Sequence, residues 1–326
     1  MRLKIMSRVA AMIVIVGFAI NVSAQTATDA VDALKDGAAK SSAKDYLGAI
    51  ESFKKCISIY DELGETENEN RITAISQIPS MQNKQGLALY KAKKYDESVA
   101  AFETLKEYAV TYENAKMAKK AKSTIPLVYY AKGASLLKTK DYSNAIVALD
   151  KSIELNPKYP MSYVRKAQVY KAQDDEVNFK ASVDGAISTS IAKRDSKTEG
   201  TAKKLASSYY LKAGASAVKS EKYSEAEKHF NTLMEYKDVN SDIYFQLMII
   251  YNKQTKWADA IKSGNKAIEL LGADAGTKDA KVYYELGNSH IGNGDNISAC
   301  DAYKKALKGD YEASAKYQIE VVLKCK

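Results

Sequence analysis

Several residue types are scarce in this chain of 326 residues, and each scarcity excludes a class of protein. Three cysteines are too few for the disulfide framework of a small secreted domain, and none has the spacing of a zinc or thiol-redox site. The two histidines, His229 and His290, have no acidic or thiol neighbour at metal-ligand spacing, so we expect both to be surface or packing residues. Only four prolines and 16 glycines interrupt a composition that favours helix throughout.

Sequence motifs of catalysis are also missing. The chain has no glycine-rich phosphate loop, no G-x-S-x-G elbow and no HExxH motif. Three consecutive carboxylates, Asp174, Asp175 and Glu176, do cluster, but they stand where a turn between two helices belongs, and we interpret them as turn residues. The sequence therefore predicts no enzyme, no metal site and no cofactor.

Long apolar runs are absent except near the N-terminus. Basic residues Arg2, Lys4 and Arg8 lead into an apolar run over residues 9–20, which is shorter than the roughly 20 residues of a membrane-spanning helix. Small residues follow at 22–24, so we expect residues 1–24 to be a signal peptide cleaved before Gln25; an uncleaved anchor is the alternative. The expected location is outside the cytoplasm, in the periplasm first, with the cell surface or secretion as the other destinations.

The charge balance is mildly basic. The chain has 49 Lys and Arg residues against 40 Asp and Glu residues, a formal charge of +9. Loss of Arg2, Lys4 and Arg8 lowers it by three, to +6. Acidic residues are interspersed among the basic ones, and an exported protein meets little nucleic acid, so we do not expect nucleic acid as a partner.

A short pattern recurs along the chain: KDYLGAI, KKYDESV, KDYSNAI, EKYSEAE and TKWADAI. In most copies a small residue stands twelve positions before the small residue of the pattern, and a bulky residue follows it by four, which is helical spacing. The pairs of small residues are Gly37 and Ala49, Gly86 and Ser98, Gly133 and Ala145, Gly214 and Ala226, and Gly287 and Ala299. The bulky residues are Phe53, Phe102, Leu149, Phe230 and Tyr303.

These offsets resemble the tetratricopeptide repeat, and Gly133, Ala145, Leu149 and Pro157 show the likeness best. Two weaker copies lie between the clear ones. The first contains Tyr163, Ala167, Tyr170 and Ala186, with Phe179 where a small residue is usual; the second contains Leu247, Tyr251, Ala260 and Ala267, with Met248 and Gly264 as departures. Tyr46, Tyr95, Tyr142, Tyr223 and Trp257 belong to the repeat as turn and packing residues and are not interpreted as a ligand site.

The resemblance implies an all-α fold, a right-handed α-solenoid of about seven helix pairs in residues 25–326. The expected repeats cover residues 30–63, 79–112, 126–159, 160–192, 207–239, 241–273 and 280–310, and a single capping helix is expected within residues 311–326. Several repeats are spaced more widely than the usual period of about 34 residues. The surplus lies in polar stretches at 64–70, 114–123 and 193–201, which are either longer helices or loops.

Two of the cysteines lie near the C-terminus. Cys300 is placed where its side chain faces the next helix layer, and Cys325 lies near the end of the cap. In an oxidising compartment a bond between them would close a loop worth about 3 kcal/mol. The alternative is that Cys300 is a small core residue, as we expect Cys56 to be, and that Cys325 is free.

The resemblance also implies a binding surface, because the first helices of such repeats line a concave face. The offsets of that face select a set rich in Lys, Asn and Tyr with few acidic residues. They are Asn83, Lys84, Leu87, Lys91, Tyr130, Lys138, Arg165, Gln168, Lys171, Lys212, Lys219, Phe245, Asn252, Lys253, Tyr284 and Asn288. Such a face favours an acidic segment or a C-terminal carboxylate; alternatively, the lysines only keep a helix face soluble.

We therefore hypothesise an exported adaptor that binds a protein or peptide segment and performs no catalysis. A permanent structural subunit of a cell-envelope or secretion assembly is the alternative, and it would expose a contiguous apolar patch. A carrier of an anionic envelope polymer would need the same basic face as the adaptor.

Overall fold

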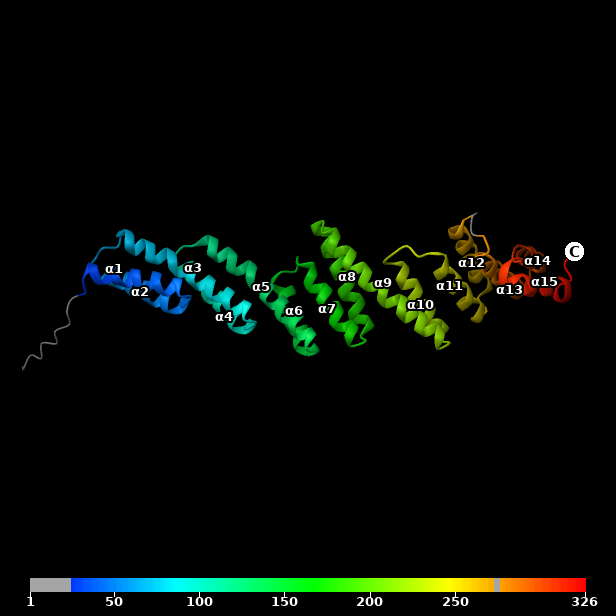
Figure 1. Ribbon diagram of the computed structural model, residues 1–326, viewed down its shortest axis with the longest axis horizontal. Coiled ribbons are helices and arrows are strands. Elements are labelled where there is room, and N and C mark those ends of the chain that lie inside the picture. Colours follow the sequence, from blue (N-terminus) through cyan, green and yellow to red (C-terminus); the bar gives the residue numbers. More distant parts are fainter. Residues whose placement is uncertain (1–24, 273–275) are drawn as a thin grey trace, which may run out of the picture. The chain divides into compact units, whose positions relative to one another are not determined.

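The computed structural model describes residues 25–272 and 276–326, and every regular element in these ranges is a helix (Figure 1). The predicted signal peptide, residues 1–24, lies outside them. The first helices of the pairs are α1 (Ala27–Ser42), α3 (Glu69–Lys91), α5 (Ala115–Lys138), α7 (Pro160–Ala172), α9 (Ser196–Lys219), α11 (Ser241–Lys253) and α13 (Ala280–Gly292). The second helices are α2 (Tyr46–Glu62), α4 (Tyr95–Thr111), α6 (Tyr142–Leu155), α8 (Glu176–Lys193), α10 (Tyr223–Met234), α12 (Trp257–Leu271) and α14 (Asn296–Lys305). This confirms the predicted all-α architecture of helix pairs.

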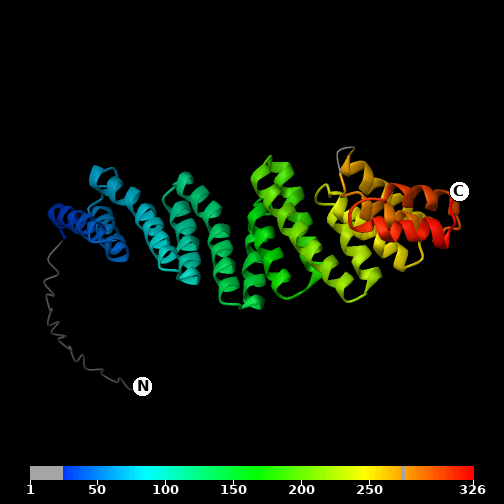
Figure 2. The ribbon, with the colours of Figure 1, turned by 45° about the vertical axis from the view of Figure 1, so that its right-hand side comes forward.

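The described residues divide into two compact units, of which the first ends at Thr124 and the second begins at Ile125. In the first, α1 packs on α2, α2 on α3 and α3 on α4, and α1 also reaches α3 directly. In the second, α7 contacts both α8 and α9, and α11 contacts both α12 and α13. Figure 2 shows neighbouring helices alternating in direction within each unit. The first helices α1 and α3, α7 and α9, and α11 and α13 therefore meet each other. No helix of the described residues is both long and apolar enough to cross a membrane.

The turn inside each pair has one recurring conformation. Its central residue is left-handed, with φ between 57° and 65° at every non-glycine position of this set. The set is Lys44, Lys93, Lys140, Asp174, Glu221 and Thr255, and Gly294 takes the same place in the seventh pair. In most pairs an aspartate then caps the second helix; Asp175, for example, accepts a hydrogen bond from the Asn178 amide at 3.0 Å. The predicted aromatics Tyr46, Tyr95, Tyr142, Tyr223 and Trp257 are each the first residue of a second helix.

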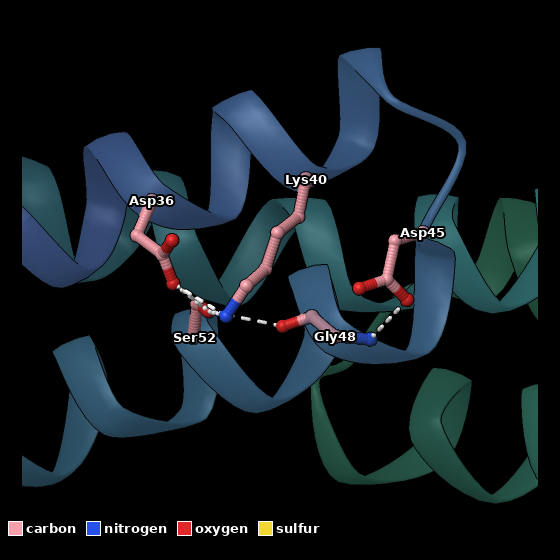
Figure 3. A network of polar contacts seen from close by, with 5 residues as sticks. All are labelled: Asp36, Lys40, Asp45, Gly48 and Ser52. Carbon is pink, nitrogen blue, oxygen red and sulfur yellow. Dashed lines mark hydrogen bonds and ion pairs between the residues drawn. The ribbon is translucent and has the colours of Figure 1, made fainter.

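The first pair shows how polar contacts supplement the apolar core (Figure 3). Lys40 on α1 forms an ion pair with Asp36, with Nζ and Oδ2 2.7 Å apart, and also lies 3.0 Å from Ser52 Oγ on α2. Ser52 in turn donates to Asp36. At the start of α2, Asp45 accepts a hydrogen bond from the Gly48 amide at 3.0 Å. The contacts of Ser52 with Lys40 and Asp36 link α2 to α1, and the Asp45 contact caps the start of α2.

Glycine at the first small position has a specific packing partner. In each clear repeat the bulky residue sixteen positions later lies directly on the glycine. A Cβ added to Gly214 would come 2.7 Å from Phe230 Cε1, and one added to Gly287 would come 2.6 Å from the Tyr303 ring. No side chain fits there without displacing the ring. Glycine costs roughly 1 kcal/mol of helix propensity here, but its missing side chain leaves space for a large buried side chain of the second helix.

The two weaker repeats pack differently. In the sixth, Met248 occupies the glycine position and Gly264 occupies the bulky position, and a Cβ on Gly264 would come 2.6 Å from Met248 Sδ. The large and small partners have exchanged helices, so the interface volume is conserved. In the fourth, Ala167 and Val183 take the two positions, and Phe179 is fully buried against Tyr209 and Tyr210 of the next repeat.

The surplus residues of the widely spaced repeats mostly extend first helices. Helices α3, α5 and α9 have 23, 24 and 24 residues, whereas α7, α11 and α13 each have 13. Pro79 and Pro126 stand inside α3 and α5, at the positions where the sequence predicts those repeats to begin. Each of these two helices therefore continues backward past its proline by several turns. Of the three polar stretches, 64–70 is largely a connection, while most of 114–123 and 193–201 is helix.

The C-terminal cap predicted within residues 311–326 is helical, and its helix changes type along its length. It consists of a short 3₁₀ turn (Gly309–Tyr311), α15 (Glu312–Tyr317) and a π-helical turn (Gln318–Val322). Buried Ala315, together with Ile319 and Leu323, packs against Tyr303 and its neighbours on the seventh pair. Cys300 and Cys325 form a disulfide with Cα atoms 5.8 Å apart, and Cys56 is a free, fully buried core residue.

Candidate functional site

All sixteen residues predicted for the concave face lie on first helices, from α3 to α13. They fall into two groups. One group is engaged inside the protein, and the other is exposed. We call the second group the inner lysines: Lys84, Lys91, Lys138, Lys171, Lys212, Lys219 and Lys253, all exposed. Within the described residues, none of the seven forms an ion pair. Lys84 does contact the protein, since its Nζ lies 3.5 Å from Ser41 Oγ and 6.0 Å from the centre of the Tyr46 ring.

The engaged group is held by hydrogen bonds and ring contacts between helices. Arg165 donates to Tyr130 Oη at 3.3 Å and to Gln168 Oε1 at 2.8 Å. Asn252 accepts from Ser289 Oγ at 2.8 Å, and Asn288 accepts from Tyr303 Oη at 2.6 Å. Arg165 thus links α7 to α5, Asn252 links α11 to α13, and Asn288 links α13 to α14.

The aromatic members of the predicted set are also engaged. Tyr284 packs between the rings of Tyr303 and Tyr311, and Phe245 lies under the Lys281 ammonium, 4.8 Å from the ring centre. Leu87 is half-buried. Asn83 is only 6% exposed, and its Oδ1 has no hydrogen-bond partner. In each unit, the exposed members of the predicted set are therefore the inner lysines.

Charge is distributed unevenly among the first helices. Helix α5 contains six lysines and no acidic residue, and α7 contains one arginine and two lysines and no acidic residue. Lysines of the second helices, in contrast, are commonly paired, as in the Lys106–Glu103 and Lys266–Glu269 pairs. An unpaired ammonium group remains available to an external anion, whereas a paired one has to break an existing contact first.

Two inner lysines from adjacent first helices share a pocket of about 520 Å³. Lys171 comes from the end of α7, and Lys212 comes from the middle of α9. We call it the α7–α9 pocket, and its other lining residues are Asp174, Glu176, Ser208, Tyr209, Ala213, Ser216, Ala217, Ser220, Lys222, Glu225 and His229. Hydroxyl groups, lysines and carboxylates all line the pocket, so it offers both donors and acceptors.

One carboxylate of the pocket, Glu176, is partly neutralised by neighbouring residues of the protein. Glu176 Oε1 lies 3.0 Å from Lys228 Nζ and 3.8 Å from His229 Nδ1. His229 is largely buried, with 13% of its side chain exposed, and its Nδ1 has no hydrogen-bond partner. Burial, followed by the nearby charges of Asp174 and Glu176, raises the pKa of Tyr209. Its hydroxyl thus stays protonated as a donor.

Sequence offsets found only part of this pocket. They identified Lys171 and Lys212, but not Tyr209, Glu176 or His229, which come from the neighbouring face of α9 and from second helices. The predicted interpretation of Asp174 as a turn residue fits its left-handed φ of 57°. A larger hollow of about 670 Å³ lies along α5 and α6 and contains none of the predicted residues. Nowhere in the described ranges do three His, Cys, Asp or Glu residues gather as a metal site.

Several solved structures are similar to this chain, while no curated protein matches it. One is the MamA protein, with 19% identity, a TM-score of 0.29, and coverage of 60% of this chain and 96% of that one. Another is a tetratricopeptide repeat protein from Parabacteroides merdae, with 14% identity, a TM-score of 0.27, and coverage of 89% and 96%. A third is the TPR2AB domain of yeast Sti1 in complex with pHSP90, with 16% identity, a TM-score of 0.31, and coverage of 91% and 97%.

A family model gives the direct assignment. The model described as "Tetratricopeptide repeat" matches residues 127–159 and 280–308. These segments coincide with the pairs α5 and α6, and α13 and α14, whose glycines lie under Leu149 and Tyr303. Over these two segments the sequence offsets, the helix pairs and the family model agree, and the chain carries tetratricopeptide repeats there.

Proposed function

We propose that the chain is an exported adaptor that binds an acidic segment of a partner protein along its first helices. The observation that supports this most is the set of inner lysines, which are exposed and unpaired on helices of which two contain no acidic residue. A carboxylate-rich segment gains charge-assisted hydrogen bonds there without displacing an internal ion pair.

The α7–α9 pocket is the proposed anchor point of that segment. Lys171 and Lys212 approach it from two helices, and the hydroxyls of Ser208, Tyr209 and Ser216 add donors. The carboxylates of Asp174 and Glu176 in its lining disfavour a uniformly anionic polymer. The proposed ligand is therefore a peptide segment of mixed polarity with acidic residues. The adaptor performs no chemistry on it.

Export is part of the proposal. The predicted signal peptide motivates it, and the disulfide between Cys300 and Cys325 supports it because disulfides persist in oxidising compartments. Detection of the processed chain, beginning at Gln25, in a periplasmic or extracellular fraction is the expected result. A full-length chain in the cytoplasmic fraction contradicts this part.

The binding proposal is tested with fluorescently labelled peptides of equal length that are acidic, neutral or basic. We expect the acidic peptide to bind best, and its affinity to fall as salt rises. A Lys171→Glu, Lys212→Glu variant should bind it at least about tenfold more weakly, as expected for loss of two charge-assisted contacts. The matched control is Lys55→Glu, Lys237→Glu, which reverses two exposed lysines outside the first helices. Equal binding of all three peptides, or an equal loss in both variants, overturns the proposal.

A further inference from the structure

The C-terminal cap presents an unusual outer face. A capping element normally shields the last repeat and shows a polar surface to water. Here the inner side is filled by Ala315, Ile319 and Leu323. The outer side carries Tyr317, Val321 and Val322, which are 56%, 54% and 50% exposed. We call this outer side the cap face.

The cap face is held in place. The disulfide ties Cys325, at the end of the cap, to Cys300 on α14. Lys304 Nζ, one turn further along α14, donates to the Lys326 carbonyl oxygen at 3.3 Å. Buried Ala315 fixes the start of the cap. The three exposed apolar side chains therefore cannot turn inward without breaking these contacts, and burial requires another surface.

The charges that border the apolar residues alternate in sign. Glu312, Lys316 and Glu320 recur every four residues along one side of the cap, and all three are exposed. Lys316 and Glu320 are only loosely paired with each other, at 3.9 Å, with side chains 63% and 60% exposed. In an antiparallel pair of identical helices related by a twofold axis at Gln318, each Lys316 meets the Glu320 of the other copy. The charge pattern is thus complementary to itself.

We propose that the cap face binds the cap face of a second copy of this chain, with the two caps antiparallel about a twofold axis near Gln318. Tyr317 lies beside that axis and packs on the apolar residues of the other copy, while Lys316 and Glu320 pair across it twice. The contact uses no inner lysine, so both copies keep their first-helix faces free and the pair presents two binding faces.

The contact is small, because it involves only about three helical turns from each copy. Interfaces of this size are weak and form in a concentration-dependent manner. Sedimentation velocity of the purified protein over a wide concentration range is the direct measurement. We expect a monomer to dimer transition in the unaltered protein, and a sedimentation coefficient that stays at the monomer value at every concentration overturns the proposal.

Removing the apolar contact should abolish the transition. Tyr317→Glu places a carboxylate next to the axis, and the dimer should be lost. Val177→Glu is the matched control, because Val177 is a 79% exposed apolar residue on α8. Its dimer should be unchanged. Far-ultraviolet circular dichroism and reductant-free melting verify that both variants are folded. Unchanged association of folded Tyr317→Glu overturns the proposal and shows that any dimer uses another surface.

Variants with reversed charges test whether the partner of the cap face is a second cap face. In Lys316→Glu, and separately in Glu320→Lys, two attractive pairs across the axis become repulsive, and each variant alone should dimerise at least about tenfold more weakly. When the two variants are mixed, the introduced glutamate of one copy faces the introduced lysine of the other at one contact. At the second contact, the Glu320 that the first variant retains faces the Lys316 that the second retains. Both contacts are attractive again, and dimers should return. No recovery on mixing contradicts the antiparallel cap pairing.

Discussion

The fifth and sixth repeats solve the same packing problem with opposite assignments of large and small residues. In the fifth, Gly214 on the first helix lies under Phe230 of the second. In the sixth, Met248 on the first helix lies against Gly264 of the second. Both repeats bury these positions fully or nearly so. The repeat therefore constrains the sum of the two side-chain volumes more strongly than the residue at either position.

Substitutions at the large and small positions of the fifth repeat should change the free energy of unfolding most. Phe230→Gly removes a buried ring and should lower the free energy of unfolding by about 4 kcal/mol, and Gly214→Met should cost about 2 kcal/mol through overpacking. The double variant copies the sixth repeat into the fifth, and should cost at least about 1 kcal/mol less than the sum. Urea unfolding followed by circular dichroism measures all three. Additive costs would show that the exchange in the sixth repeat is not a compensation.

The seventh repeat adds a covalent tie to the arrangement of the fifth, because Gly287 lies under Tyr303 and the disulfide fastens the cap above them. The bond joins residues 25 positions apart, and Cys300→Ser should lower the stability of the oxidised protein by about 3 kcal/mol. Thermal melts with and without reductant check this. Reductant should lower the melting temperature of the unaltered protein and leave that of the variant unchanged. If reductant leaves the melting temperature of the unaltered protein unchanged, the expectation is wrong.

The fifth and sixth repeats also differ in the surroundings of the residue that caps the second helix. Lysine caps both α10 and α12 without a side-chain hydrogen bond. Lys256 pairs with Glu227 of the previous repeat at 2.7 Å, whereas Lys222 pairs only with its near neighbour Glu225. Lys222→Asp should therefore stabilise by about 1 kcal/mol in denaturant unfolding, and Lys256→Asp should bring little net gain. Equal gains in both would mean that the Lys256–Glu227 pair contributes nothing.

The gain at Lys222→Asp should depend on pH in a defined direction. Hydrogen bonds from the start of the helix lower the pKa of the corresponding caps Asp175 and Asp195. A carboxyl group with a lowered folded-state pKa contributes its full stability above its unfolded value of about 3.9. The contribution then disappears as the pH falls through the folded-state pKa. Unfolding measured at about pH 7 and about pH 3 should show the full gain only at the higher pH.

The smallest expected effect concerns the turns of the same two repeats. Glu221 and Thr255 both have left-handed backbones, with φ of 57° and 58°. This conformation is costly for any residue with a Cβ and most of all for a β-branched one. Thr255→Gly should stabilise by about 0.5 kcal/mol after the entropy of the unfolded chain is subtracted, and Glu221→Gly should stabilise less. Destabilisation of both in urea unfolding would mean that the side chains contribute contacts that offset the strain.

The sequence predicted the helix pairs well, because the small and bulky residues of each pair recur at fixed distances along the chain. Gly214 and Phe230 follow the family pattern, and both could be placed in advance. Met248 and Gly264 could only be recorded as separate departures, because their compensation appears when the two side chains are seen in contact. The stretch at 114–123 could not be assigned to helix or loop, since a mostly polar sequence lacks the apolar period that reveals a helix.

The candidate site was predictable to a lesser degree. Offsets placed Lys171 and Lys212 on adjacent first helices, but the pocket between them also depends on Tyr209 and His229. The roles of Arg165 and Asn288 depend on rotamers and on partners 35 and 15 positions away. No local pattern specifies such contacts.

The N-terminal part of α5, before Pro126, shows one way in which the surface of such a chain can be changed. The part of this helix that precedes Pro126 includes four exposed lysines, Lys116, Lys119, Lys120 and Lys122. A new repeat requires a full pair of matched helices, with its own glycine and ring and with interfaces to both neighbours. Lengthening an existing helix requires none of these. Substitutions in such an extension can therefore change its charge and reach residue by residue, without altering the contact between Gly133 and Leu149 in the same repeat.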